Sequence, residues 1–205
     1  MEKSLFKGST SLKEKKKIIM KKLEECININ DSILEKGIKT LNSIDETDTR
    51  FNCLLNKIDR CVDKRKSSPV KMKFLLVTTI IYKDYLKEYS NESILTLAST
   101  AFSSASYEDI ELHLGDFVPK YNDKFLKEIY KRQKDFESIL YDLTAMDMIF
   151  DNLLDKSRIS REEKNNMLLK IYKTMSNKEV FGIENKIYEN TCNNMEQYET
   201  KKMRR

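Results

Sequence analysis

Six lysines lie within ten residues near the amino terminus, a density at which ammonium groups can bind a polyanion. On a helix Lys13, Lys16 and Lys17 share a face, as do Lys17 and Lys21, while Lys15 and Lys22 point elsewhere. Lysine binds phosphate as a mobile point charge and does not read nucleic-acid bases. The cluster predicts either a solvated helix surface or a polyanion-binding site, and its residues are Lys13, Lys15, Lys16, Lys17, Lys21 and Lys22.

The surroundings of these lysines favour an anionic membrane over nucleic acid. Binding to single-stranded nucleic acid usually adds aromatic side chains on which bases stack. Only Phe6 lies near the lysines, and no arginine precedes Arg50. Each lysine close to an anionic membrane contributes about 1 kcal/mol to binding, and Leu5 and Phe6 could add shallow insertion. We therefore predict membrane binding by the lysine cluster.

The residues that could support catalysis or metal binding do not form a recognisable site. His113 is the only histidine, and no nucleophile and orienting group are seen to converge on it. The glycines are isolated, so no phosphate-binding loop is present. The four cysteines form no C-x-x-C pair, which makes a zinc site improbable and favours reduced structural thiols. We predict no enzymatic activity, no cofactor, no metal and no small-molecule substrate.

Charge is unevenly distributed along the 205 residues. The net charge is +5, charged residues make up 35% of the chain, and the mean hydropathy is low. Residues 1–24 hold eight lysines against three glutamates, residues 92–155 hold 6 basic against 13 acidic side chains, and residues 156–205 are basic again. Opposite charges on one chain can support contacts between copies or with related subunits. Averaging of these charges over the folded surface is the alternative.

Helical periodicity dominates the first third of the chain and predicts an all-α fold. A first helix is expected from Ser11 to Gly37, where glycine can take the left-handed conformation that ends helices, with continuation to Leu41 as the alternative. Further helices are expected over 46–66 and 70–88, and residues 11–66 would form a long hairpin. The apolar run from Phe74 to Tyr82 is too short to cross a bilayer, which needs about 20 residues. We predict a buried helix there, with a strand as the alternative.

Capping signals predict shorter helices packed against this hairpin. Asn91 is the expected N-cap of a small-residue helix, Ser106 of the next, and Pro119 the start of a third. Ser160 followed by Glu163 is a capping box. A helical core is expected over 1–175 and a polar C-terminal helix or tail over 176–205. The helices are expected over 92–103, 107–118, 119–152, 161–175 and 183–203.

Residues 92–125 combine a small-residue helix with a set of aromatic and basic residues at fixed spacing. The pattern consists of Glu92, Leu97, Ala101, Asp109-Ile110, Phe117, Lys120-Tyr121 and Phe125. It resembles the core of the increased-sodium-tolerance family, ESCRT-III-like regulators of the vacuolar-sorting AAA ATPase. Phe6-Lys7 is similar to the start of that family's first helix, and Leu34 to Gly37 to its hairpin turn. The arginine usual after the alanine is replaced by Phe102-Ser103.

This resemblance implies a non-enzymatic subunit in endosomal sorting and membrane remodelling, cytoplasmic and peripheral on endosomal membranes. Its partners would be other ESCRT-III-like subunits, an anionic membrane surface and the AAA ATPase that disassembles the filaments, with homo-oligomers as a further option. Tyr198, Lys202 and Met203 would belong to a degenerate ATPase-docking helix. No secretory leader is recognised, which fits this localisation.

Two alternatives remain. Gly37 to Leu41, followed by Asp45-Glu46, resembles part of the first helix of SNARE proteins with two SNARE helices, which would make the chain a coiled-coil membrane-fusion protein. Thr47 stands where the central glutamine of such a bundle is expected. The other alternative is a basic helical protein that binds nucleic acid, whose binding would depend strongly on salt.

Overall fold

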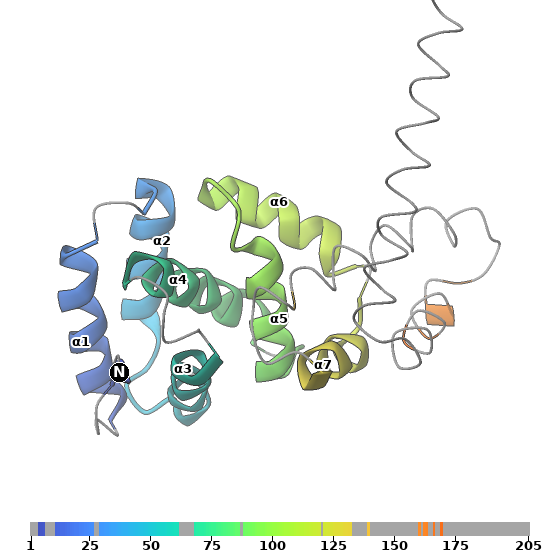
Figure 1. Ribbon diagram of the computed structural model, residues 1–205, viewed down its shortest axis with the longest axis horizontal. Helices are drawn as coiled ribbons and strands as arrows, with labels where there is room; N and C mark the ends of the chain where they lie inside the picture. The colour runs from blue at the N-terminus through green and yellow to red at the C-terminus, as the bar shows by residue number, and fades with distance from the viewer. Residues whose placement is uncertain are drawn as a thin grey trace, which may run out of the picture. The chain divides into compact units, whose positions relative to one another are not determined.

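The computed structural model describes residues 4–6, 11–26, 29–61, 68–86, 88–119 and 121–132, with the single positions 139, 160, 162, 163, 166 and 169. Within these residues seven helices and no strand are present, which confirms the all-α fold class (Figure 1). The chain divides into two compact units, Met1–Leu140 and Tyr141–Arg205. All seven helices belong to the first unit. The predicted boundary at 175 lies outside the described residues.

Short loops connect most of the helices. Their bounds are α1 Leu12–Glu24, α2 Asp31–Ser43, α3 Thr49–Cys61, α4 Ser68–Tyr85, α5 Asn91–Ala101, α6 Tyr107–Phe117 and α7 Asp123–Arg132. None of these described helices combines the length and the apolar content needed to span a bilayer. The run from Phe74 to Tyr82 lies buried inside α4, as predicted.

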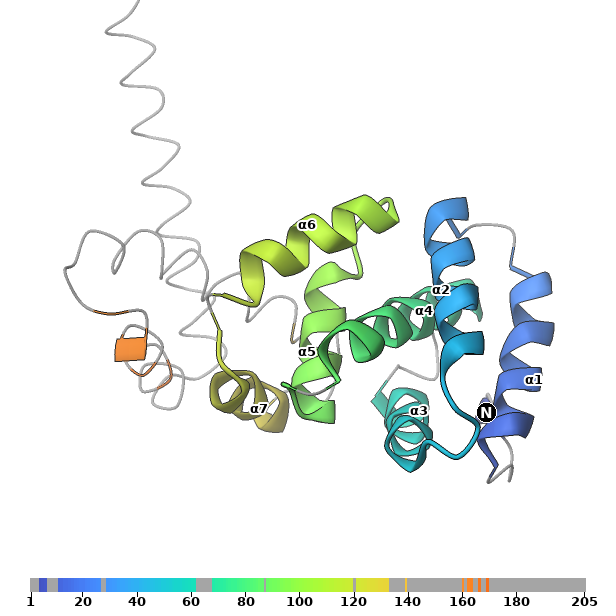
Figure 2. The ribbon, with the colours of Figure 1, turned by 180° about the vertical axis from the view of Figure 1, so that it is seen from behind.

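The first predicted helix is wrong in its length, because it is broken into α1 and α2. α1 begins after Ser11, whose hydroxyl accepts the Glu14 N–H, and ends at Glu24. Asn30 then caps a new helix by accepting the Ser32 N–H at 2.9 Å. A side chain that satisfies the first backbone donors of a helix favours a fresh start there over continuation. The expected single hairpin over 11–66 is not seen, and α1 and α2 instead lie side by side (Figures 1 and 2).

Gly37 serves packing instead of ending a helix. It lies inside α2 and is buried against α4, where a Cβ added to it would lie 2.7 Å from Leu76 Cδ2. Its missing side chain therefore lets the backbone of α2 approach α4 closely. This contact joins α2 to the apolar run of α4 in the core.

α5 is buried along most of its length. Every residue from Ser93 to Ala101 is buried, between α4, α6 and α7 (Figure 2). Most of its hydroxyl groups return hydrogen bonds to the helix itself, as in Ser99 Oγ to the Leu95 carbonyl at 2.8 Å, and the Ser93 hydroxyl donates to Asp123. Burial therefore leaves these hydroxyls satisfied. The small residues of α5 pack against α4, α6 and α7.

Capping residues decide where the later helices begin. Ser106 caps α6 through a complete capping box with Asp109, as predicted. The N-cap of α5 is Ser90, one residue before the predicted Asn91. α7 begins at Asp123 and not at Pro119, because Asn122 accepts the Phe125 N–H at 2.9 Å.

The ends of the other predicted helices differ by a few residues or lie outside the described part of the chain. α3 begins at Thr49 and α4 at Ser68, against predicted starts at 46 and 70. The Ser160–Glu163 capping box is present: the Ser160 N–H donates to Glu163 Oε2 at 2.8 Å, and the Glu163 N–H donates to Ser160 Oγ at 3.2 Å. The predicted continuation of α7 beyond Arg132 and the segment 183–203 lie largely or wholly outside the described residues.

Candidate functional site

Three of the six clustered lysines form an exposed stripe on α1. Lys13, Lys17 and Lys21 follow one another every four residues, and all three are exposed. Residues four apart lie on neighbouring turns of one helix face. Lys13 pairs with Glu46 at 3.7 Å, but the two side chains are 62% and 54% exposed, so the pair contributes little. Lys17 and Lys21 form no ion pair with another described residue.

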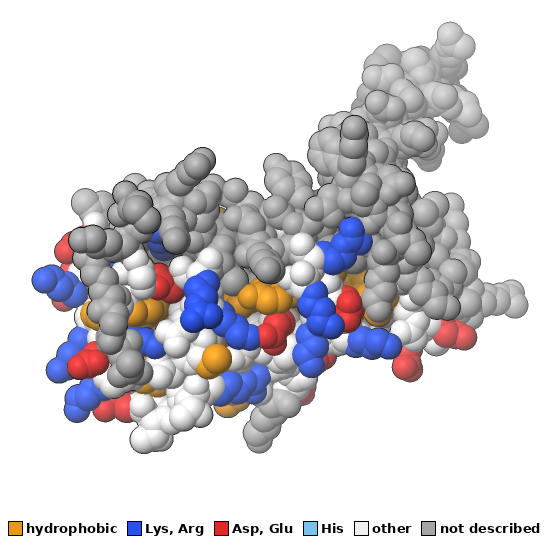
Figure 3. Space-filling model, turned by 60° about the horizontal axis from the view of Figure 1, so that its bottom comes forward, with side chains coloured by type: hydrophobic (Ala, Val, Ile, Leu, Met, Phe, Trp, Pro, Cys, Tyr) orange, Lys and Arg blue, Asp and Glu red, His pale blue; other side chains and the backbone are white. Residues whose placement is uncertain are grey.

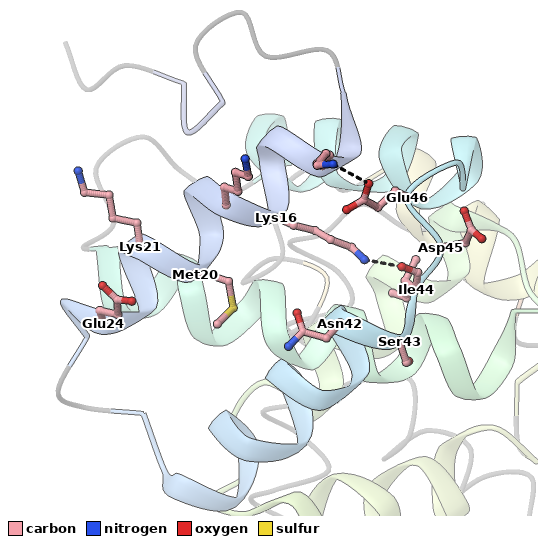
Figure 4. A pocket seen from close by; sticks show the side chains of 11 residues that line it. Lys16, Met20, Lys21, Glu24, Asn42, Ser43, Ile44, Asp45 and Glu46 are labelled. Carbon is pink, nitrogen blue, oxygen red and sulfur yellow. Dashed lines mark hydrogen bonds and ion pairs between the residues drawn. The ribbon is translucent and has the colours of Figure 1, made fainter.

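Lys16 extends across an open groove of about 680 Å³ between α1 and residues 42–46 (Figure 4). Its ammonium donates to the carbonyl oxygen of Ile44, just after the end of α2. Burial lowers the pKa of Lys16, while the carboxylates of Glu46 and Asp45 oppose that shift. A cation at a helix C-terminus is favourable. Lys16 therefore joins α1 to the end of α2. Lys22, the remaining lysine of the cluster, is half-buried.

Lys15 does not belong to the exposed set, which corrects the prediction for this residue. Its side chain is 1% exposed and donates to Asn52 Oδ1 at 2.6 Å and Asn56 Oδ1 at 2.7 Å. Burial lowers the pKa of Lys15. The sequence held a signal for this position, since Lys15 shares the helical spacing of the buried Leu12 and Ile19.

The aromatic residue expected to insert into a membrane is also buried. Phe6 is only 4% exposed, and its ring centroid lies 5.4 Å from the Lys15 ammonium. In this structure Phe6 therefore packs inside the protein. The predicted partner-binding residues Tyr198, Lys202 and Met203 lie outside the described residues.

Positive charge is not confined to α1. Lys and Arg side chains are spread over the face shown in Figure 3, with acidic side chains between them. Several lysines outside α1 are already paired, including Lys57 with Glu92, Lys127 with Asp123 and Lys131 with Glu128. The α1 stripe differs because its three exposed lysines follow one another every four residues along one helix face.

The residues that carry the family resemblance have structural roles in this fold. Leu97, Ala101 and Ile110 are buried. The rings of Tyr121 and Phe125 stack with centroids 4.9 Å apart and planes 9° from parallel. The pattern is thus a packing pattern for α5, α6 and α7, while Lys120 and the Phe117 side chain lie outside what the structure describes.

Two polar clusters that sequence reasoning missed hold the helices together. Arg50 donates to the carbonyl oxygens of Leu86 and Tyr89 and to Asn91 Oδ1, which ties α3 to the link between α4 and α5. Asp123 accepts from the Ser90 N–H at 2.8 Å and the Ser93 hydroxyl at 2.6 Å, which ties α7 to the start of α5. Each joins residues at least 30 positions apart, so local spacing carried no signal for them.

Acidic side chains of the middle segment are exposed on α6. Glu108, Asp109 and Glu111 all face solvent, and Leu112 beside them is 69% exposed.

No group of His, Cys, Asp and Glu that could hold a metal ion is found in the described part of the chain. His113 lies half-buried on α6.

Comparison of the chain with protein-family models, with curated proteins and with solved structures finds no match. The assignment of a role therefore depends on the geometry above and on the resemblance drawn from the sequence.

Proposed function

We propose that this protein is a non-enzymatic, ESCRT-III-like helical subunit that binds an anionic membrane through the lysine stripe of α1. The observation that carries the membrane part is the row of three exposed lysines, Lys13, Lys17 and Lys21, at four-residue spacing on one face of α1. Ammonium groups in this position remain available to lipid phosphates. Three such lysines would together contribute about 3 kcal/mol at an anionic surface.

The ESCRT-III-like part of the proposal rests on the resemblance in residues 92–125. By that resemblance the subunit would act in endosomal membrane remodelling and regulate the AAA ATPase that disassembles the filaments. The all-α fold and the close packing of α5 with α6 and α7 are compatible with it. The missing long hairpin gives it no support, so membrane binding is the part to test first.

The SNARE-like alternative is not favoured by any observation. Gly37 and Leu41, which would face a partner helix in a SNARE bundle, are buried within this chain. Such a bundle would therefore require α2 to separate from α4.

The first prediction concerns liposome co-sedimentation. We expect the wild-type protein to bind vesicles of phosphatidylcholine with 30% phosphatidylserine, and to bind pure phosphatidylcholine at least tenfold more weakly. Binding should weaken as salt rises from 0.05 to 0.5 M, since screening shortens the range of surface charge interactions. The double substitution Lys17→Glu/Lys21→Glu should weaken binding by about 2 kcal/mol or more, which is ~30-fold.

The matched control is Lys39→Glu/Lys83→Glu, which makes the same change of net charge with exposed lysines of α2 and α4. We expect this control to bind much as the wild type does. Equal loss in the two variants would mean that net charge alone acts and would contradict a specific α1 face. Stronger salt-dependent binding to RNA or DNA than to acidic vesicles would favour the nucleic-acid alternative.

A further inference from the structure

The chain's first described residues bind at the junction of α1, α3 and α4. The Leu5 N–H donates to Asp59 Oδ1 at 2.8 Å, and the Ser4 hydroxyl donates to the other oxygen of the same carboxylate. Phe6 is buried at this junction. A single carboxylate of α3 therefore holds two polar groups of this three-residue segment, while the aromatic side chain anchors it.

The receiving surface is preformed by the core. Ile58 of α3 and Met72 and Leu75 of α4 contribute buried apolar side chains beside Phe6. A small cavity lies between these residues and the segment. Because Met72 and Leu75 belong to the buried side of α4, the apolar floor of the site is set by the fold and not by the segment that covers it.

The position of Lys15 would favour an aromatic anchor at this site. Two amide oxygens, from Asn52 and Asn56, hold its ammonium in place, and that ammonium lies 5.4 Å from the Phe6 ring centroid. A cation is attracted to the face of an aromatic ring and has no such attraction to an aliphatic side chain. A buried lysine is unusual in a core. Among the described residues no carboxylate forms an ion pair with Lys15, although Asp59 is near enough to oppose the lowering of its pKa by burial, and facing an aromatic ligand gives this lysine a role.

We infer that this junction is a docking site for a short peptide with a hydroxyl residue followed two positions later by phenylalanine, and that residues 4–6 occupy it as an internal ligand. The partner is a protein segment of the same chemistry. It would donate one hydroxyl and one backbone N–H to Asp59 and place its phenylalanine ring beside Lys15. The inference does not depend on membrane binding.

Residues 4–6 determine the affinity that a partner segment needs, because the partner must displace them from the site. A ligand tethered by a short linker has an effective concentration of the order of mM. A partner segment in solution therefore displaces residues 4–6 only if it binds more tightly or is itself held nearby. The site would thus be closed until a matching partner is brought close.

The test measures peptide binding to a full-length variant whose own segment cannot dock. Leu5→Pro removes the N–H that Asp59 accepts, and Phe6→Ala removes the anchor. We expect a fluorescein-labelled peptide of residues 1–10 to bind this double variant at least tenfold more tightly than it binds the wild type. The same peptide with Phe6→Ala should bind at least tenfold more weakly, and Phe6→Leu should also weaken binding, since Lys15 faces the ring.

Adding Asp59→Asn to the double variant should weaken peptide binding at least fivefold. Circular dichroism must show that the variants keep their helical content. A folded double variant that fails to bind, or whose binding ignores both Asp59 and the phenylalanine, would overturn the inference. A dimer formed by exchange of residues 4–6 would assign the site to a second copy and overturn the partner proposed here.

A second measurement on the wild type covers the case in which the double variant does not fold. The unlabelled peptide is titrated to millimolar concentration into isotope-labelled wild-type protein. We expect the Leu5 amide resonance to move to its free-chain position as the peptide displaces it. An unchanged Leu5 resonance at saturating peptide would overturn the inference.

Discussion

At the scale of single residues, Asp123 shows how one carboxylate can join two helices. Burial alone would raise its pKa. The hydrogen bonds from Lys127, Ser93 and Ser90 outweigh that effect and lower the pKa of Asp123 from 3.8 to about 2. The ionised form is therefore bound more favourably in the folded protein than in the unfolded chain. Its position at the N-terminus of α5 adds a favourable interaction with the helix dipole.

This lowered pKa predicts acid-sensitive stability. Because the pKa of Asp123 in the folded protein lies below its value in the unfolded chain, its contribution is present above about pH 4 and is lost as the pH falls toward 2. The side chain is 31% exposed, so we expect Asp123→Asn to reduce the free energy of unfolding by about 1–2 kcal/mol at pH 7. The variant should also lose part of the stability change between pH 4 and pH 2.

Urea unfolding followed by circular dichroism at pH 7 and at pH 3 measures both effects. Glu35→Gln, at an exposed carboxylate of α2, is the control and should change little at either pH. If Asp123→Asn unfolds like the wild type at both pH values, the carboxylate does not stabilise the contact between α5 and α7.

At the scale of helices, the contact between α2 and α4 depends on one missing side chain. Alanine is preferred over glycine within a helix by about 1 kcal/mol. At Gly37, however, a new Cβ would lie 2.7 Å from Leu76 Cδ2 and 2.9 Å from Leu76 Cβ. Overpacking of this kind costs typically 1–3 kcal/mol. We therefore expect Gly37→Ala to destabilise the protein by about 1–2 kcal/mol, despite its better helix propensity.

Gly115→Ala is the matched control, because no atom lies within 4 Å of a Cβ added there. It should stabilise α6 by up to about 1 kcal/mol. Thermal unfolding of the two variants checks the opposite signs. Stabilisation by Gly37→Ala would show that α2 and α4 pack less tightly than this structure indicates.

The helices also show what could be predicted from the sequence and what could not. Periodicity predicted the all-α fold, and local capping chemistry predicted the start of α6 at Ser106. Both signals lie within a few residues of the element that they describe. The break before Asn30 depended on a local cap that competes with continuation of the helix. The role of Gly37 depended on a contact with Leu76, which is distant in the sequence. A glycine near a possible helix end looks the same in the sequence whether it ends the helix or packs inside it.

The sequence predicted which helix carries the candidate site but not which of its lysines are exposed. The density of lysines located α1 as the basic element, and Lys13, Lys17 and Lys21 are indeed exposed. The burial of Lys15 followed from two asparagines of α3 and from Phe6, residues that local charge counting does not connect with it. Charge patterns therefore identified the helix but not which of its lysines face solvent.

At the scale of the whole molecule, α1 combines a core face with a separate charged face. The core face carries Leu12, Lys15, Ile19 and Leu23, and the charged face carries the exposed stripe. Contacts that stabilise the fold and contacts available to a membrane thus lie on different sides of one helix. Charge reversal on the core face should therefore destabilise the fold. Charge reversal on the charged face should weaken membrane binding and leave the fold stable.

The last prediction compares Lys15→Glu with Lys17→Glu. At position 15 the new carboxylate would face the amide oxygens of Asn52 and Asn56 in a buried site, where an uncompensated charge costs about 3 kcal/mol or more. At position 17 the same change occurs on the exposed face and should alter the free energy of unfolding by less than about 0.5 kcal/mol. Thermal unfolding separates the two, and acidic-vesicle binding should weaken for Lys17→Glu while it stays fully folded. If Lys17→Glu lowers the melting temperature as much as Lys15→Glu does, the two faces of α1 are not independent. A loss of vesicle binding by Lys17→Glu could then not be assigned to the exposed stripe.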